Sequence, residues 1–424
     1  MLERFFALLL SGLSLALYLP AAQAALSIDI TQTVKNGKSV AVVPFGNDNG
    51  PGNSISEVIR ADLGRSGIFR IMDRAALPAQ PDQPSEVNLG TWKSVGAEGL
   101  VIGQVQRAGG NITVSFYLYT PNDGRQLAAQ RFTVPANEWR AVAHRIADVI
   151  YERLTGEPGA FFTRLAYVTQ TGKTYRLNVS DSDGANPQVV VSSRQPLMSP
   201  AWSPDGRKLA YVSFESGRSA VFLQDLVTGK RERLAFFSGI NSAPAFSPDG
   251  RYLAMSLSKT GNPEIHVMDL GSRSLRQVTR NPAIDTEPSW SPDGRYIVFT
   301  SDRSGTPQLY RVSATGGDER RLTFSGSYNG SASYAPRGGV IAFVHRAGGV
   351  YSLARINDDG TGMQTLDRAA NNESPSFSPN GRMILYATLR GGRQVLAATS
   401  VDGQVKQLIQ VPREDIREPA WSPR

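Results

Sequence analysis

The sequence of 424 residues contains no cysteine and only three histidines. Without cysteine the chain can form neither disulfides nor thiolate metal sites, and it offers no cysteine for nucleophilic catalysis or lipid attachment. His144, His266 and His345 lie far apart and follow no metal-ligand spacing. We therefore expect neither a transition-metal site nor a catalytic triad that depends on histidine.

Two motifs of common enzyme classes are also missing. The Gly-x-Ser-x-Gly turn that carries the nucleophile of α/β-hydrolases does not occur. The glycine-containing stretch at residues 46–52 lacks the Gly-Lys-Ser/Thr of a phosphate-binding loop. These absences favour a binding protein over an enzyme and imply no cofactor.

Long apolar runs are confined to the N-terminus. Residues 5–19 form an apolar run of 15 residues, and Ala22 and Ala24 supply the small residues that a signal peptidase accepts. The run is shorter than the roughly 20 residues of a membrane-spanning helix. We expect a cleaved signal peptide at residues 1–24, a periplasmic mature chain, and contact with the membrane only through partners.

The formal net charge is +8, and the excess lies after residue 160. Scattered surface charge is the simpler explanation, and a basic face that steers an acidic protein partner is the alternative. The basic residues do not cluster, so nucleic acid is not an expected partner.

A repeat begins at residue 200. Residues 200–207 read PAWSPDGR and recur as PAFSPDGR, PSWSPDGR and PSFSPNGR, with a degenerate copy at residues 333–338 and a last copy at residues 419–424. Three short strand patterns follow each complete copy, which makes four strands in a unit of about 44 residues, typical of a propeller blade. The repeated aromatic residues are spaced by 43 or 44 residues: Trp202, Phe246, Trp290, Tyr334, Phe377 and Trp421.

The two ends of the repeat region complete each other. Residues 164–191 contain three strand patterns with no leading copy, and the last copy has no strands after it. Pairing the strand of Trp421 with that of Leu165 would close a ring of six blades over residues 159–424 and leave no open ring edge. In the degenerate copy Arg337 replaces Asp or Asn, which leaves its turn in doubt.

Residues 25–158 follow different patterns and predict a small α/β domain before the propeller. Residues 82–88 are expected to form an exposed loop, and residues 155–159 a linker. Residues 25–34 alternate between apolar and polar, so they could pair within their own domain or add to the sheet of a partner. The expected strands are 40–45, 69–72, 99–105, 112–118 and 126–134, and the expected helices are 53–64 and 139–154.

A signal peptide, a small α/β domain and this propeller repeat together resemble the TolB family, periplasmic components of the Tol-Pal system of Gram-negative bacteria. The resemblance covers essentially the whole mature chain and includes residues 40–45, 214–218, 258–261 and 281–288. It implies a non-enzymatic monomer that supports outer-membrane integrity and invagination during cell division. It also implies two partners, the peptidoglycan-associated lipoprotein Pal at the propeller and the inner-membrane protein TolA at the N-terminal segment.

The resemblance places the TolA contact at the start of the mature chain and the lipoprotein contact on the loops that lead into the aromatic strands. The implied TolA-binding residues are Ala25, Leu26, Ser27, Ile28, Asp29 and Ile30. The implied lipoprotein-binding residues are Met198, Ser199, Ile240, Asn241, Ser242, Ala243, Asp285, Thr286, Glu287, Tyr328, Asn329, Asn372, Glu373, Arg417 and Glu418.

The repeat itself also points to these loops, because in a propeller they surround one mouth of the central channel. Glu287 and Glu418 hold the same repeat position in opposite blades. With Asp285, Glu373 and Asp415 they could form an acidic mouth for Ca²⁺ or a basic peptide, or they could be solvated loop carboxylates. The rival function is a hydrolase with a propeller lid or with its site in the channel.

Overall fold

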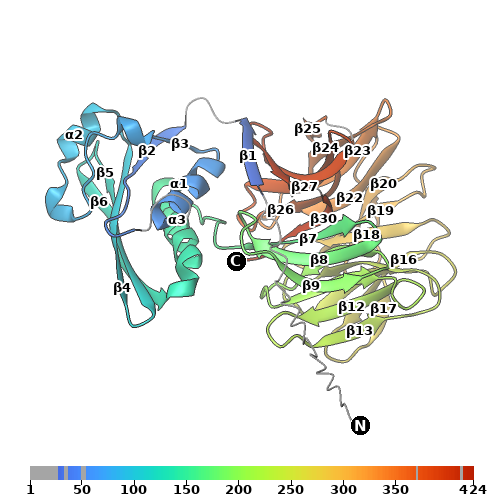
Figure 1. The fold of residues 1–424 in the computed structure, drawn as a ribbon. Helices are drawn as coiled ribbons and strands as arrows, with labels where there is room; N and C mark the ends of the chain where they lie inside the picture. Colours follow the sequence, from blue (N-terminus) through green and yellow to red (C-terminus); the bar gives the residue numbers. More distant parts are fainter. Residues whose placement is uncertain (1–26, 33–36, 49–53, 369–370, 411–413) are drawn as a thin grey trace, which may run out of the picture.

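The computed structural model describes residues 27–32, 37–48, 54–368, 371–410 and 414–424. A small α/β domain lies beside a six-bladed β-propeller, which confirms the predicted fold class (Figure 1). The predicted signal peptide, residues 1–24, falls outside the described residues, as do Ala25 and Leu26. None of the described helices has the length and apolar character needed to cross a membrane.

The N-terminal domain is built on a five-stranded sheet in the order β3-β2-β4-β5-β6. Strand β2 is parallel to β3 and β4, and β4, β5 and β6 form an antiparallel meander. The strands are β2 (Lys38–Val42), β3 (Phe69–Ile71), β4 (Gly99–Ala108), β5 (Asn111–Thr120) and β6 (Arg125–Pro135); the helices are α1 (Ile55–Arg65), α2 (Leu89–Ser94) and α3 (Trp139–Thr155), with short 3-10 turns at Arg74–Ala76, Pro84–Glu86 and Ala136–Glu138.

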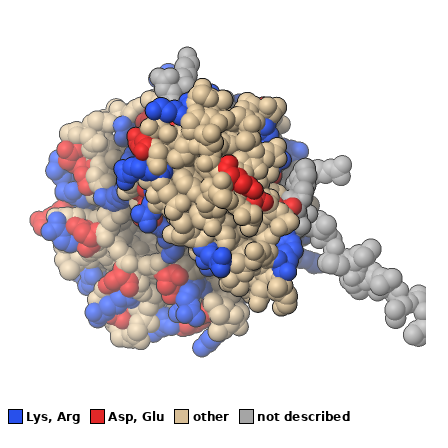
Figure 2. All heavy atoms as spheres, turned by 90° about the vertical axis from the view of Figure 1, so that its left-hand side faces the viewer, with Lys and Arg blue, Asp and Glu red and all other residues tan. Residues whose placement is uncertain are grey.

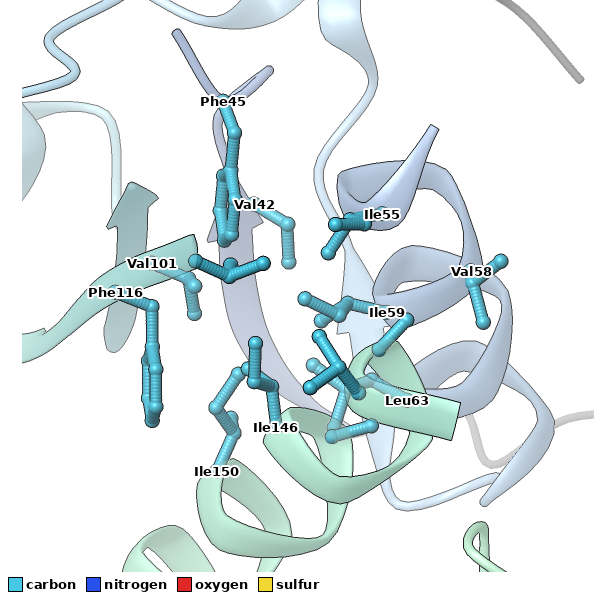
Figure 3. Close-up of a cluster of buried hydrophobic side chains, with 14 of the residues drawn as sticks. Val42, Phe45, Ile55, Val58, Ile59, Leu63, Val101, Phe116, Ile146 and Ile150 are labelled. Carbon is cyan, nitrogen blue, oxygen red and sulfur yellow. The ribbon is translucent and has the colours of Figure 1, made fainter. Parts of the chain in front are cut away.

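Helices α1 and α3 cover one face of this sheet, where Ile59, Phe116 and Ile146 belong to one buried apolar cluster (Figure 3). Helix α2 covers part of the other face and buries Trp92. Helix α1 begins at Ser54, whose Oγ accepts the Glu57 N–H at 3.3 Å, so one of the free N–H groups of the first turn is satisfied.

Each blade of the propeller is an antiparallel sheet of four consecutive strands, except that the sixth is completed from the C-terminus. The first three blades are β10 (Leu197–Trp202) to β13 (Arg231–Ala235) through β11 (Lys208–Ser213) and β12 (Ala220–Asp225); β14 (Asn241–Phe246), β15 (Tyr252–Leu257), β16 (Glu264–Asp269) and β17 (Leu275–Gln277); and β18 (Asp285–Trp290), β19 (Tyr296–Ser301), β20 (Gln308–Ser313) and β21 (Arg320–Arg321). The others are β22 (Tyr328–Tyr334), β23 (Val340–Ala347), β24 (Val350–Asn357) and β25 (Gln364–Asp367); β26 (Glu373–Phe377), β27 (Met383–Arg390), β28 (Arg393–Ser400) and β29 (Lys406–Gln410); and β30 (Asp415–Trp421), β7 (Arg164–Thr171), β8 (Thr174–Asp181) and β9 (Gln188–Ser193).

The repeated Ser-Pro-Asp-Gly forms a tight turn between the first two strands of a blade. In the first blade Gly206 has φ of +66° and donates its N–H to the Ser203 carbonyl at 2.8 Å, a left-handed position that suits glycine. The degenerate copy makes the same turn, because Gly338 donates to the Ala335 carbonyl at 2.9 Å. Replacement of Asp by Arg337 therefore leaves the turn intact.

The repeated tryptophans lie between blades. Trp202 donates its indole N–H to the carbonyl of Ala420, and Trp290 donates to that of Ala245, each at 3.0 Å and each to the preceding blade. Strand β30 pairs with β7, with Trp421 opposite Leu165, and this pairing closes the ring. Figure 2 views the molecule from the side of the N-terminal domain, and on the surface seen there basic and acidic side chains are interspersed.

Strand β1 (Ser27–Gln32) adopts neither of the positions considered from its sequence. It pairs antiparallel with β29, the outer strand of the fifth blade, with Ile28 opposite Ile409. The physical reason is that an outer strand leaves a row of backbone N–H and C=O groups free, and an alternating segment can satisfy them. The N-terminal segment is thus a fifth strand of a propeller blade.

Candidate functional site: the mouth of the propeller channel

The innermost strands of the blades surround a cavity of about 630 Å³ at the mouth predicted from the repeat. Its lining includes eight of the predicted contact residues: Met198, Ser199, Ala243, Glu287, Tyr328, Asn372, Glu373 and Glu418. The other predicted contact residues of the propeller lie outside this lining: Ile240, Asn241, Ser242, Asp285, Thr286, Asn329 and Arg417.

A β-bulge interrupts every innermost strand at the same repeat position. The ladder shifts register there, and in each blade one residue other than glycine has a positive φ between 49° and 55°. Such a conformation costs on the order of 1 kcal/mol or more. We call these residues the bulge ring, and all six line the cavity: Ser199, Ala243, Glu287, Ser331, Ser374 and Glu418.

The two glutamates of the bulge ring connect neighbouring blades. Glu287 accepts the N–H of Ser331 at 2.6 Å and its hydroxyl at 2.8 Å, and it also accepts the Thr300 hydroxyl at 2.7 Å. Glu418 accepts the N–H of Ser199 at 3.2 Å. Each carboxylate therefore holds the bulge of the next blade in place.

Burial affects the pKa of two carboxyl groups of the mouth, those of Glu373 and Glu418. Burial raises the pKa of Glu418 to about 7, and the charges of Glu373 and Glu287 add to this effect, while the Ser199 N–H and Arg417 oppose it. Burial also raises the pKa of Glu373. Near neutral pH the mouth therefore carries less negative charge than its formal count.

Two of the predicted acidic residues serve the fold instead of the mouth. Asp285 is fully buried and accepts two hydrogen bonds from Arg303, at 3.1 and 2.9 Å. Asp415 accepts the N–H of Gln394 at 3.1 Å. The acidic mouth is thus limited to Glu287, Glu373 and Glu418, whose oxygens are of the type Ca²⁺ binds, and a calcium ion there stays a prediction.

A buried polar residue holds each of four mouth loops. Asn241, Asp285, Asn329 and Asn372 occupy equivalent positions and are at most 1% exposed. Asn241 donates to the carbonyls of Ser219, Phe237 and Gly239 at 2.9–3.2 Å and accepts the Phe237 N–H at 2.9 Å. These four side chains position the loops and are not themselves exposed for contact.

Replacing Asn241 by Ala is therefore expected to lower the free energy of unfolding by about 2 kcal/mol, because several buried backbone groups lose their partner. Chemical denaturation measures this change. Val227→Ala, at a side chain that is 66% exposed, is the surface control. A loss no larger than that of a surface substitution would contradict this role.

Exposed apolar side chains stand on the loops around the mouth. Met198, Ile240, Ile284 and Phe324 are 39%, 46%, 50% and 74% exposed; Met198 lies in β10, Ile240 and Ile284 directly precede β14 and β18, and Phe324 lies in the loop between β21 and β22. We call these four residues the apolar rim. Phe324 was not predicted, because it lies in a loop where no periodicity marks it. Exposed apolar clusters of this kind are typical of protein-binding sites.

The histidines are engaged separately and form no catalytic group among the described residues. His266 Nδ1 lies 3.0 Å from the Glu264 carbonyl, and His345 Nδ1 lies 2.8 Å from Asn329 Oδ1. Burial lowers the pKa of both rings. His144 lies on α3, at the contact between the domains.

Comparison with known proteins gives matches in both domains. Residues 26–127 match the model of the TolB amino-terminal domain, and residues 151–424 match that of the TolB beta propeller domain. The crystal structure of TolB from Acinetobacter baumannii is 40% identical, superposes with a TM-score of 0.88, and covers 94% of this chain and 100% of that chain.

Curated relatives of this chain include proteins named Tol-Pal system protein TolB. The one from Methylococcus capsulatus is 48% identical over 224 residues, 52% of this chain and 53% of the relative. The one from Xanthomonas oryzae pv. oryzae is 47% identical over 242 residues, 55% of each chain. The match spans about half the length of these curated relatives. Since the propeller model alone covers more than half of the sequence, the chain belongs to the TolB family.

Proposed function

We propose that this chain is a non-enzymatic docking component of the Tol-Pal system in the periplasm. Its propeller mouth binds the peptidoglycan-associated lipoprotein, and its N-terminal segment binds TolA. Relatives named Tol-Pal system protein TolB support the system, and that family is periplasmic. We extend the same role to outer-membrane integrity and to invagination during cell division.

The observation that carries this proposal is the apolar rim. Four exposed apolar side chains stand at the inner strands of four consecutive blades, and buried polar groups fix the mouth loops, so the surface is already ordered before a partner arrives. Aliphatic and aromatic anchors on a rigid surface provide most of the binding energy at many protein interfaces. The hydrolase alternative has no comparable support, because the mouth offers no nucleophile paired with a histidine among the described residues.

TolA binding by the N-terminal segment depends on the pairing of this segment with the propeller. Its backbone is hydrogen-bonded to β29, so the predicted contact residues Ser27, Ile28, Asp29 and Ile30 are already part of a sheet. Strand β1 is the outermost strand of its sheet, so a TolA strand can pair with its outer edge, whereas transfer of the segment into a TolA sheet requires it to leave β29.

The test uses the mature chain and purified soluble domains of the lipoprotein and of TolA, with dissociation constants from calorimetry. Ile240→Asp/Thr286→Arg is expected to weaken lipoprotein binding by about 100-fold, because a charge replaces an apolar anchor. Deletion of residues 25–32 is expected to remove TolA binding alone. Val227→Asp, a change at a side chain that is 66% exposed away from the mouth loops, should alter neither affinity. Unchanged lipoprotein affinity in a folded double variant would refute the proposed surface.

A further inference from the structure

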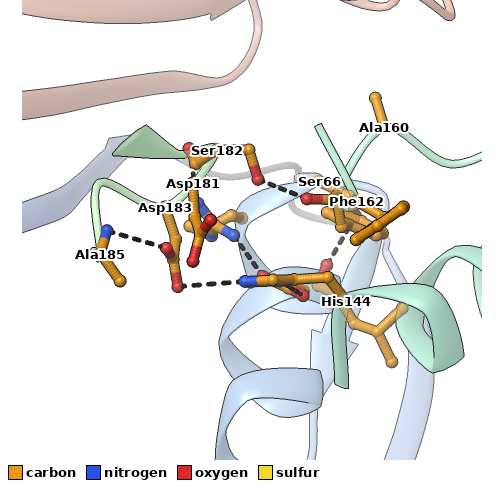
Figure 4. Close-up of polar contacts among 12 residues, drawn as sticks. Ser66, His144, Ala160, Phe162, Asp181, Ser182, Asp183 and Ala185 are labelled. Carbon is orange, nitrogen blue, oxygen red and sulfur yellow. Dashed lines mark hydrogen bonds and ion pairs between the residues drawn. The ribbon is translucent and has the colours of Figure 1, made fainter. Parts of the chain in front are cut away.

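The contact between the two domains contains a partly buried group of charged side chains that the docking role does not use. We call it the interdomain charge cluster (Figure 4). Asp62 and His144 are 0% and 2% exposed. The cluster takes members from both domains: Asp62 and Arg65 of α1, Arg140 and His144 of α3, and Asp181 and Asp183 at the end of β8 and in the turn after it.

His144 stands between a carboxylate of each domain. Its Nδ1 lies 2.6 Å from Asp62 Oδ2 of the N-terminal domain, and its Nε2 lies 3.7 Å from Asp183 Oδ2 of the propeller. The Nε2 atom is buried without a hydrogen-bond partner at the present distance. If Asp183 moved slightly closer to the ring, the Nε2–H would donate a second hydrogen bond to its carboxylate, provided that both ring nitrogens carry a proton.

The charges of the other cluster members favour a protonated, positively charged ring at His144. Arg65 pairs with Asp62 and also donates to the Ser182 carbonyl at 3.3 Å, and Arg140 pairs with Asp183. Arg140 also approaches Asp181, at 4.0 Å. Three carboxylates and two guanidinium groups leave one negative charge, which an imidazolium ion at His144 cancels.

A metal ion fits this position less well than a proton does. Asp62, His144 and Asp183 bring three potential ligand atoms within 4.8 Å of one another. However, guanidinium groups already pair with both carboxylates. A divalent cation would have to displace those pairs or carry the buried site to excess positive charge, and either is costly.

We propose that His144 is a proton-operated latch between the domains. In its imidazolium form it holds Asp62 of the N-terminal domain and Asp183 of the propeller together, and loss of the proton loosens the contact. The neutral ring keeps only one N–H, so it can donate to one carboxylate and leaves the buried cluster with a net negative charge.

The pKa directions agree with this geometry. Burial alone would lower the pKa of His144, but the charge and hydrogen bond of Asp62 and the charge of Asp183 outweigh it and raise the pKa above 6.5. Burial would raise the pKa of Asp183, yet Arg65, His144 and Arg140 lower it. Burial raises the pKa of Asp181, which His144 and Asn186 partly offset.

The remaining charged neighbour on α3 is already satisfied. Asp148 accepts the N–H groups of Phe161 and Phe162, at 2.8 and 3.2 Å, and lies 3.9 Å from Arg424. Burial raises its pKa, and those two hydrogen bonds and Arg424 oppose the rise. His144 therefore sets the sign of the pH dependence. Its stabilisation of the contact between the domains is complete below pH 6.5, the unfolded pKa, and is lost as the pH rises through the higher pKa of the folded state.

Two measurements on the full mature chain test the latch. Histidines labelled with ¹³C give three ring signals by NMR, one for each histidine, and His144 is expected to titrate above 6.5. Because the chain has no cysteine, spin labels can be placed at Asn122→Cys and Thr228→Cys, one on each domain. The distance distribution between the labels is expected to be narrow at pH 5.5 and to broaden at pH 9.

Variants separate a latch from a merely structural histidine. His144→Gln cannot be charged and is expected to give the broad distribution at both pH values, whereas Asp183→Asn should lower the pKa of His144. His266→Gln, at a buried ring on β16, is the matched control and should leave the pH response intact. A His144 pKa at or below 6.5, or an identical distribution across its titration, would overturn the proposal even if His144→Gln fails to fold.

Discussion

Removal of residues 415–424 is expected to abolish the cooperative unfolding of the propeller. The deletion takes away β30, the only inner strand of the sixth blade, and with it the ladder to β7. It leaves the buried Leu165 and Tyr167 without the cover of Ile416, and removes the indole of Trp421 that donates to Thr163 at 2.9 Å. Burial of one large apolar side chain contributes about 1.5–3 kcal/mol, so the total loss is comparable with the roughly 5–15 kcal/mol that keeps a typical domain folded.

Thermal unfolding followed by circular dichroism measures this effect. The truncated chain should lose the sharp transition of the propeller, while Arg424→Ala, which removes only the pair with Asp148, should keep it. A synthetic peptide of residues 415–424 should restore the transition, because the deletion leaves the edge of β7 open to it. A truncated chain that unfolds at the temperature of the full chain would show that the closing strand is dispensable.

Replacement of Glu418 by Gln is expected to change how stability depends on pH. The folded pKa of Glu418 is raised from 4.5 to about 7, so the folded state binds more protons than the unfolded state between these values. Stability of the unaltered chain therefore falls as the pH rises through this window. Each pKa unit corresponds to about 1.4 kcal/mol, and with allowance for water in the cavity the total is roughly 1–3 kcal/mol.

Urea denaturation at pH 5 and pH 7.5 measures the difference. Relative to the unaltered chain, Glu418→Gln should gain this free energy between the two pH values, because Gln cannot ionise. Glu373→Gln is the companion variant and should change in the same direction, since burial raises that pKa as well. Parallel pH profiles of Glu418→Gln and the unaltered chain would contradict a protonated carboxyl at the mouth.

The repeat made the propeller predictable in detail. Six aromatic residues at nearly constant spacing determine the number of blades, and the unmatched strand patterns at the two ends determine how the ring closes. The turn at Gly338 formed despite Arg337, because backbone geometry and glycine define that turn more strongly than the Asp side chain does. The mouth was predictable for the same reason, since it follows from the position of each loop in the repeat.

Features that depend on contacts between distant segments were not predictable. The short helix α2 packs Trp92 on the sheet, but its six residues give too little periodicity to identify. Asp285 looked like a mouth carboxylate because its partner Arg303 lies in another turn of the same blade. Likewise, nothing in the alternation of residues 27–32 indicates β29 as their partner, since any sheet edge would accept them.

The two long-range pairings impose an order on folding. Strand β7 pairs with β30 and β1 pairs with β29, so each of these early strands needs a partner from the last residues of the chain. Pairs that close such long loops form late, because the entropy of loop closure opposes them before their contacts can compensate. An edge of β1 and an edge of β7 therefore stay open until the C-terminal strands are in place, and a chain that crosses a membrane from its N-terminus is most exposed to wrong pairing just before its last residues arrive.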